Sequence, residues 1–87
     1  MTQIVFNRLN QVLKTRGRKR SAHLADVKDG LWTEPVKIGA RAVAWPEHEN
    51  ERLKAAQLAG ASQDEMRELV KQLHAERIAS REGRALT

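Results

Sequence analysis

The sequence predicts a mainly α-helical domain that carries one small β-hairpin. Four segments show helical periodicity or the residues that start and stop helices, and glycine or proline separates them. Between the second and third segments, residues 35–45 alternate larger apolar side chains with Lys or Ala on either side of a Gly-Ala-Arg turn. Because 87 residues make one domain with a marginal core, the hairpin must pack on the helices.

The first predicted helix is short and ends near residues 15–17, where a glycine allows a left-handed stop. Its start is open, because Asn7 and Asn10 are both acceptable N-caps. One apolar stripe at helical spacing supports it, made of Leu9, Val12 and Leu13.

The second predicted helix spans about residues 19–29, with Leu24 and Val27 on its apolar face and Gly30 just past its end. Only a short glycine-containing turn separates it from the first helix. Two short helices joined in this way form a helix-turn-helix arrangement.

The hairpin is expected to place one apolar face on the helices and to leave Lys37 and Arg41 facing outward. Pro35 opens this unit, and Pro46 ends its second strand and suits the first turn of a helix. The expected apolar face consists of Val36, Ile38, Val43 and Trp45.

Two further helices are predicted after the hairpin. The third covers about residues 46–59, with glutamates in its first turns, and the fourth covers about residues 62–79 and starts at a capping box between Ser62 and Glu65. Residues 81–87 show no periodicity and are expected to be disordered. The fourth helix has an apolar stripe that can continue toward Ile78 and consists of Met66, Leu69, Val70 and Leu73.

The positive charge is concentrated at the N-terminus. Residues 1–20 contain six Lys or Arg and no acid, residues 21–45 contain three bases and three acids, and residues 46–87 contain seven bases and eight acids. A cationic block on one part of a small domain favours a nucleic-acid phosphate backbone as partner. A solvated basic face would give the same pattern, so charge alone leaves both interpretations open.

The start of the second helix combines several cations with no carboxylate, which the helix dipole disfavours unless a phosphate binds there. In a recognition helix, the first residues also meet base edges in the major groove. The candidate phosphate contacts are therefore Lys14, Arg16, Arg18 and Lys19. The candidate base contacts are Arg20, Ser21 and His23, and the candidate hairpin contacts are Lys37 and Arg41.

No enzyme, metal site or cofactor is expected. The chain has no cysteine, its three histidines lie on different predicted elements, and it has no phosphate-binding glycine loop. The three aromatic residues, Phe6, Trp32 and Trp45, are expected to pack in the core. No segment has the roughly 20 apolar residues that span a bilayer, so a cytoplasmic protein without a membrane partner is expected.

Taken together, these residues resemble the AlpA-type prophage regulators and the related phage excisionases, which are small winged-helix proteins akin to the DNA-binding domain of the MerR class. The resemblance covers about residues 6–59 and is most specific in the Pro-Val-Lys-Ile-Gly-x-Arg-Ala-Val-x-Trp run of residues 35–45. The other residues that carry it are Arg8, Leu9, Val12, Gly17, Ser21 and Gly30.

The resemblance implies a winged helix-turn-helix domain over residues 1–60, with the second helix in the major groove and the hairpin as the wing. The sequence departs from the family pattern at Arg16, Leu24 and Thr33, which replace a small or hydroxyl residue, an aromatic residue and a proline. Residues 61–80 lie outside that pattern, and this helix either packs on the domain or mediates self-association.

The sequence thus predicts a sequence-specific double-stranded DNA-binding protein. It would act as an excisionase or as a transcription regulator, as a homodimer or a cooperative array on DNA, with an integrase or RNA polymerase as further partner. The alternative is a small interaction protein that uses the apolar stripe of the fourth helix for a protein target.

Overall fold

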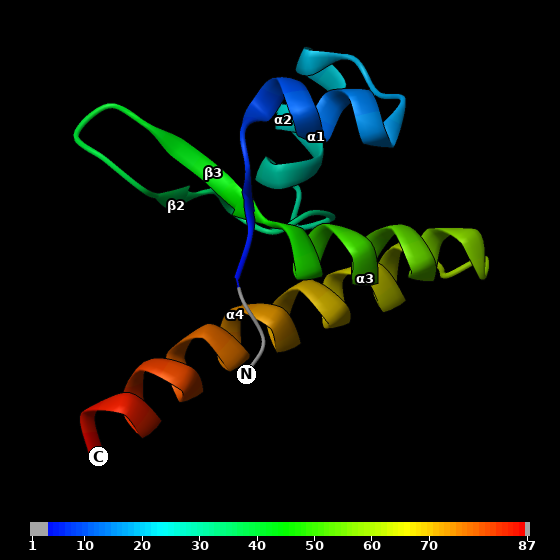
Figure 1. The fold of residues 1–87 in the computed structure, drawn as a ribbon. Coiled ribbons are helices and arrows are strands. Elements are labelled where there is room, and N and C mark those ends of the chain that lie inside the picture. The colour runs from blue at the N-terminus through cyan, green and yellow to red at the C-terminus, as the bar shows by residue number, and fades with distance from the viewer. Residues whose placement is uncertain (1–3, 87) are drawn as a thin grey trace.

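Over residues 4–86, which the computed structural model describes, the chain forms four helices and three short strands (Figure 1). Side chains are described for residues 4–80. The fold is mainly helical with a small antiparallel sheet, as the sequence predicts. In chain order the elements are β1 (Phe6–Asn7), α1 (Leu9–Arg16), α2 (Arg20–Lys28), β2 (Val36–Lys37), β3 (Val43–Pro46), α3 (Glu47–Leu58) and α4 (Gln63–Leu86).

The sheet has the strand order β1-β3-β2, and both pairings are antiparallel. The predicted hairpin corresponds to β2 and β3, while β1 adds a strand that the sequence does not predict. In β1, Phe6 pairs with Pro46 and Asn7 pairs with Trp45. A two-residue strand is too short to show the alternation that identifies strands in a sequence. Its pairing makes β3 the central strand of the sheet.

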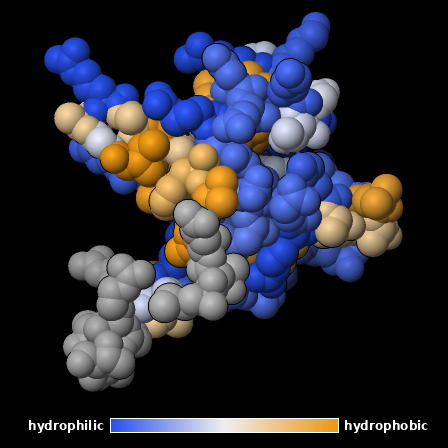
Figure 2. All heavy atoms as spheres, viewed as in Figure 1, coloured by the Kyte–Doolittle hydropathy of each residue, from blue (hydrophilic) through white to orange (hydrophobic). Residues whose placement is uncertain are grey.

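The predicted apolar face of the hairpin is wrong in its register. Lys37 pairs with Val43, and paired residues lie on the same face of a sheet. Val43 therefore shares its face with Lys37, and Val36 lies on the opposite face. Ile38 and Val43 keep 43% and 42% of their surface exposed. The reason is that only residues 44–46, at the base of β3, are buried, while the far end of the hairpin projects from the helices and carries exposed apolar side chains (Figures 1 and 2).

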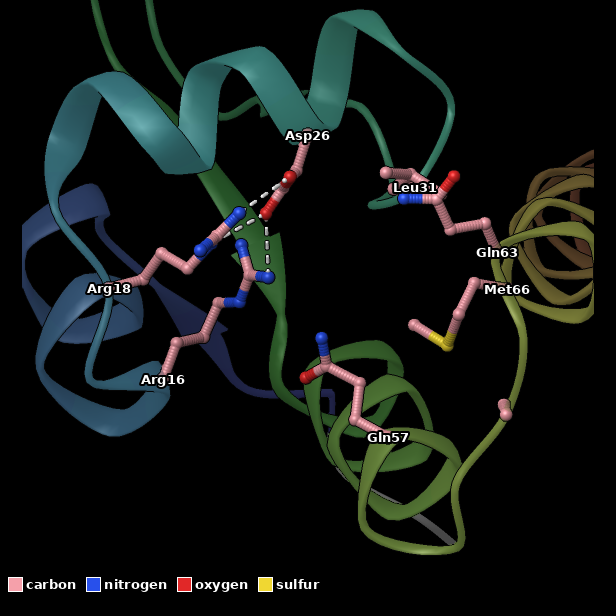
Figure 3. A pocket seen from close by; sticks show the side chains of 8 residues that line it. Arg16, Arg18, Asp26, Leu31, Gln57, Gln63 and Met66 are labelled. Carbon is pink, nitrogen blue, oxygen red and sulfur yellow. Dashed lines mark hydrogen bonds and ion pairs between the residues drawn. The ribbon is translucent and has the colours of Figure 1, made fainter.

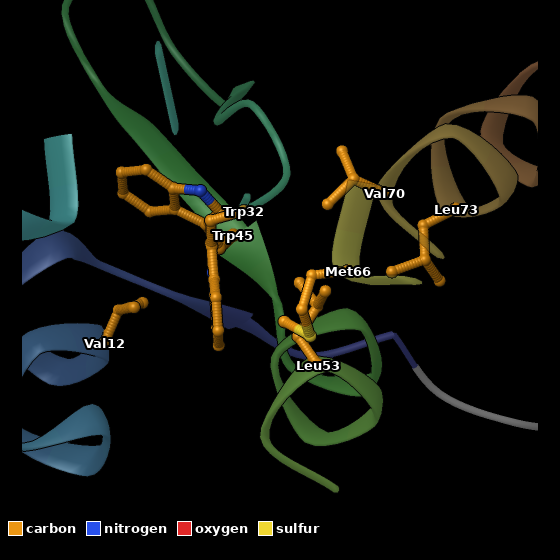
Figure 4. Close-up of a cluster of buried hydrophobic side chains, with 7 residues drawn as sticks. All are labelled: Val12, Trp32, Trp45, Leu53, Met66, Val70 and Leu73. Atoms are coloured by element: carbon orange, nitrogen blue, oxygen red, sulfur yellow. The ribbon is translucent and has the colours of Figure 1, made fainter. Parts of the chain in front are cut away.

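The core lies between α1 on one side of β3 and the α3–α4 pair on the other. Figure 4 shows the two tryptophans between Val12 and the apolar side chains of α3 and α4. The prediction that both tryptophans are buried is confirmed, and most of the apolar stripe of α4 packs into the same core. The buried cluster consists of Val12, Trp32, Trp45, Leu53, Met66, Val70 and Leu73, and Leu69 packs against it.

Two predicted core residues are not in the core, because Phe6 and Leu24 are each 43% exposed. On α2 the inward positions are taken by His23, Asp26 and Val27, which follow helical spacing. Leu24 lies one position past His23, so it faces outward. Phe6 lies on the edge strand β1 at a point that no helix covers completely.

Several helix ends agree with their sequence signals. Gly17 ends α1 with φ of 65°, and its N–H donates to the carbonyl of Leu13, as a left-handed stop requires. Ser62 and Glu65 form the predicted capping box, with hydrogen bonds of 3.0 and 3.1 Å. The start of α1 differs, because its N-cap is Arg8 and neither predicted asparagine.

Helix α4 is longer than predicted and packs on the domain. It runs back along α3 and extends past the start of that helix (Figure 1). Its backbone is helical to Leu86, beyond residue 79, where the sequence predicts its end, and the disorder expected for residues 81–87 stays a prediction. Thr87 lies outside the described residues. Within residues 4–86, no helix is long and apolar enough to cross a bilayer.

Candidate nucleic-acid interface

The turn between α1 and α2 is held by one carboxylate. Asp26, on α2, accepts hydrogen bonds from Arg16 Nη2 at 2.9 Å and from Arg18 Nε and Nη2 at 2.9 and 3.0 Å. Figure 3 shows both arginines pointing at this carboxylate. Burial alone would raise the pKa of Asp26, but the hydrogen bonds from Arg18 and Arg16 hold that pKa below its ordinary value. Asp26 therefore fixes the end of α1 and the following turn against α2.

The guanidinium of Arg16 is enclosed against the core. Its guanidinium lies 3.7 Å from the centroid of the Trp32 ring, and its side chain is 3% exposed. Burial lowers the pKa of Arg16, and the hydrogen bond to Asp26 opposes that shift. The prediction that Arg16 contacts a DNA phosphate is wrong, because its charge is enclosed and already neutralised.

His23 is also enclosed. It is 0% exposed and contacts both tryptophans edge-on, at 4.9 Å from Trp45 and 6.1 Å from Trp32 between ring centroids. Its Nδ1 lies 2.6 Å from Arg16 Nη1, and because a guanidinium only donates, this nitrogen accepts and the ring is neutral. Burial, followed by the charge of Arg16, lowers the pKa of His23 to about 4. The prediction that His23 reads a base is therefore wrong.

This buried histidine makes stability depend on pH. Its pKa falls from 6.5 to about 4 on folding, so between these values the unfolded chain binds more protons than the folded chain. Its contribution is complete above pH 6.5 and is lost as the pH falls toward about 4. We expect the free energy of unfolding, measured with urea, to drop by roughly 1 kcal/mol from about pH 7.5 to about pH 5.5.

The matched control for this pH dependence is His23→Gln, which removes the titrating group from the same place. Its free energy of unfolding should be lower near neutral pH but should change less over the same pH interval. If His23→Gln keeps the full pH dependence, the dependence comes from another group and the role given to His23 is wrong.

A cleft of about 430 Å³ separates the α1–α2 turn from the end of α3 and the start of α4 (Figure 3). Arg16, Arg18 and Asp26 form one wall, while Gln57 and Met66 lie on the other side. The charged wall carries two positive charges and one negative charge, which already pair with one another. It therefore offers little free charge to a ligand.

The basic residues of the described part divide sharply into paired and unpaired. Among side chains 4–80, every Lys or Arg after residue 46 forms an ion pair: Arg52, Lys54, Arg67, Lys71 and Arg77. Seven exposed bases have no ion pair with any of these described side chains: Arg8, Lys14, Lys19, Arg20, Lys28, Lys37 and Arg41. All seven lie before β3, so among the described side chains 4–80 the unpaired positive charge is confined to the part of the chain that precedes β3.

The start of α2 brings three of the predicted contacts together. Lys19 is the N-cap, Arg20 is the first helical residue and Ser21 follows, and all three are exposed. The cap makes no side-chain hydrogen bond, and the first turn holds no acid. The first backbone N–H groups of α2 therefore receive no side-chain acceptor from the cap, and two cations lie next to them. A bound anion would stabilise this arrangement.

The other predicted contacts lie on separate elements. Lys14 is exposed on α1, Lys37 is exposed on β2, and Arg41 is exposed in the turn between β2 and β3. Figure 2 shows hydrophilic side chains over α1 and α2 and at the far end of the hairpin. Arg18 belongs fully to neither the paired nor the unpaired bases. Its side chain pairs with Asp26 but is still 45% exposed.

Sequence reasoning missed Asp26, Arg8 and Lys28. The sequence does contain one signal for Asp26, because it is the only acid in residues 1–28 and follows several arginines. An isolated acid in such a segment is a candidate for an ion pair with one of them. Arg8 and Lys28 join the unpaired bases, but nothing in their spacing distinguishes them from ordinary surface cations.

Comparisons of the chain with protein-family models, with curated proteins and with solved structures found no match. The resemblance to AlpA-type regulators and excisionases therefore stays a prediction. Function has to be inferred from the charge, exposure and pairing of the residues described above.

Proposed function

We propose that this protein binds double-stranded DNA sequence-specifically through a winged helix-turn-helix, with α2 in the major groove and the β2–β3 hairpin on the backbone or in the minor groove. The observation that carries the proposal is that, among the described side chains 4–80, the unpaired and exposed cations all lie in residues 8–41. Phosphate backbones attract such a set of cations, while a chain that needs charge only for solubility has no reason to segregate it.

The exposed residues take distinct roles in this proposal. Arg20 and Ser21, in the first turn of α2, read base edges, and arginine there can make a bidentate contact with guanine. Lys14 and Lys19 neutralise phosphates, and Lys37 with Arg41 contacts the backbone from the hairpin.

Arg18 has a more limited part than a free cation. Its Nε and Nη2 are used by Asp26, whereas its Nη1 makes no hydrogen bond to any described residue. The hydrogen bond to Asp26 raises the pKa of Arg18, so the group stays charged. It can therefore donate to a phosphate from a fixed orientation, with much of its charge already balanced.

A module of this size reads only a few base pairs and buries on the order of 600 to 1,000 Å² of its surface. Useful specificity then requires repeated sites and more than one copy of the protein. Two regulatory roles fit this requirement: an excisionase that assists an integrase, and a transcription regulator that acts at a promoter with RNA polymerase. The interaction-protein alternative loses support, because Met66, Val70 and Leu73 of its apolar stripe are buried within the domain.

The test is a titration of the protein onto a labelled duplex from the region upstream of its own gene, or onto duplexes that it selects from a random pool, against a scrambled duplex. We expect Arg20→Ala to weaken binding to the specific duplex by about 1 to 3 kcal/mol and to leave binding to the scrambled duplex nearly unchanged.

The matched control is Lys71→Ala, which removes the same charge from an exposed ion pair on α4. It should leave the affinity for both duplexes unchanged. Failure of the protein to enrich any duplex from the pool, with equal weak binding to both duplexes, would contradict sequence-specific recognition.

A further inference from the structure

The connection between α2 and the hairpin has no regular secondary structure over residues 29–35. It nevertheless lies against the core, because Trp32 and Thr33 are 0% exposed. The carbonyl of Thr33 accepts a 2.7 Å hydrogen bond from Trp45 Nε1. Backbone groups in such a segment lack the partners that a helix or sheet would provide, so other side chains must satisfy them.

Those partners come from α4, at both ends of the connection. Arg67 Nε donates to the carbonyl of Asp29 at 3.2 Å, next to the end of α2. At the hairpin end, His74 Nε2 accepts from the N–H of Glu34 at 3.1 Å, and Arg77 Nη2 donates to the carbonyl of the same residue at 2.9 Å. Both polar backbone groups of Glu34 are thus bound by one helix that is distant in sequence.

Arg77 also binds the segment that leaves the hairpin. Its Nε donates to Glu49 Oε2 at 2.7 Å, and its Nη2 pairs with the other oxygen of that carboxylate. Glu49 is 1% exposed and lies in the first turn of α3, directly after β3. The guanidinium of Arg77 therefore joins Glu34, which lies just before β2, to α3, which follows β3.

We infer that α4 braces the hairpin against α2, with Arg77 and His74 as positioning residues for the contact that the hairpin makes with DNA. The DNA part of this inference rests on the proposed function. The physical basis is that the hairpin projects from the helices and only its base is held (Figure 1). If the base is fixed, the conformational entropy that DNA binding would otherwise cost is already lost in the free protein.

The brace is tested first without DNA. Arg77→Lys keeps a positive charge beside the buried Glu49 but lacks the planar fork that serves two partners at once. Combined with His74→Ala, it removes the acceptor of the Glu34 N–H and leaves one ammonium in place of the fork that binds both Glu49 and the Glu34 carbonyl. The control is Arg52→Lys, at an exposed ion pair with Glu76 that also joins α3 to α4 but does not contact the connection.

Because the chain has no cysteine, spin labels can be placed specifically at Ala25→Cys on α2 and Ala40→Cys in the hairpin turn, which are both exposed. The distribution of the distance between the two labels should broaden in the His74→Ala/Arg77→Lys variant and should stay unchanged in Arg52→Lys. An unchanged distribution in the first variant would overturn the inference, whether or not the protein binds DNA.

The effect on DNA is measured on the duplex selected from the random pool. We expect His74→Ala/Arg77→Lys to weaken binding roughly 3- to 10-fold in the parent protein and to have no further effect when Lys37→Ala and Arg41→Ala are present. An equal loss in both backgrounds would show that Arg77 does not act through the hairpin. If the parent protein binds no duplex, the proposed function fails, while the label distances still decide whether α4 braces the hairpin.

Discussion

Asp26→Ala is expected to lower the free energy of unfolding by about 3 to 5 kcal/mol, because it leaves a buried guanidinium without its counter-charge. Arg16 is 3% exposed, so water cannot replace the carboxylate that Asp26 provides. A domain of this size is stable by only about 5 to 15 kcal/mol, and the loss would consume much of that. Unfolding by urea at neutral pH, followed by circular dichroism, measures the effect.

Two further variants separate this loss from other effects of removing Asp26. Arg18→Ala deletes the other arginine of the network, but its side chain is 45% exposed, so its cost should not exceed about 1 kcal/mol. Arg16→Met with Asp26→Leu replaces the buried pair by apolar side chains and should recover most of the stability lost in Asp26→Ala. If Asp26→Ala costs no more than Arg18→Ala, Arg16 does not depend on Asp26.

Signals that act within one helical turn could be predicted from the sequence. Gly17 stops α1 because a left-handed residue is needed there, and Ser62 with Glu65 caps α4 through two reciprocal hydrogen bonds. The apolar stripe of α4 is buried because its spacing matches the helix and leaves one face for the core. In each case the determining contacts lie three or four residues apart.

The features that the sequence did not predict depend on contacts between distant residues. The prediction of glutamates in the first turn of the third helix is confirmed, but it does not reveal that Glu49 is buried against Arg77, 28 residues away. The run of cations before His23 predicts that this residue lies at the DNA surface, but the core position on α2 falls on His23 and not on Leu24. Spacing along one helix does not determine which of its faces another element covers.

Removing three of the proposed phosphate contacts, with Lys19→Ala, Lys37→Ala and Arg41→Ala together, should change the salt dependence of DNA binding. Each phosphate contact adds about 0.9 to the slope of log affinity against log salt concentration, so the slope should become shallower by about 2.7. The affinity for specific and scrambled duplexes should fall together, because backbone contacts carry no direct sequence information. Fluorescence anisotropy at four salt concentrations gives the slope.

The chain offers a control with the same change in net charge. Arg52→Ala, Lys54→Ala and Lys71→Ala together also remove three positive charges, but from ion pairs on α3 and α4. If the interface consists of the unpaired cations before β3, this control should leave the slope nearly unchanged. An equally shallow slope in both triple variants would mean that only the net charge matters, and the interface assigned to α2 and the hairpin would be wrong.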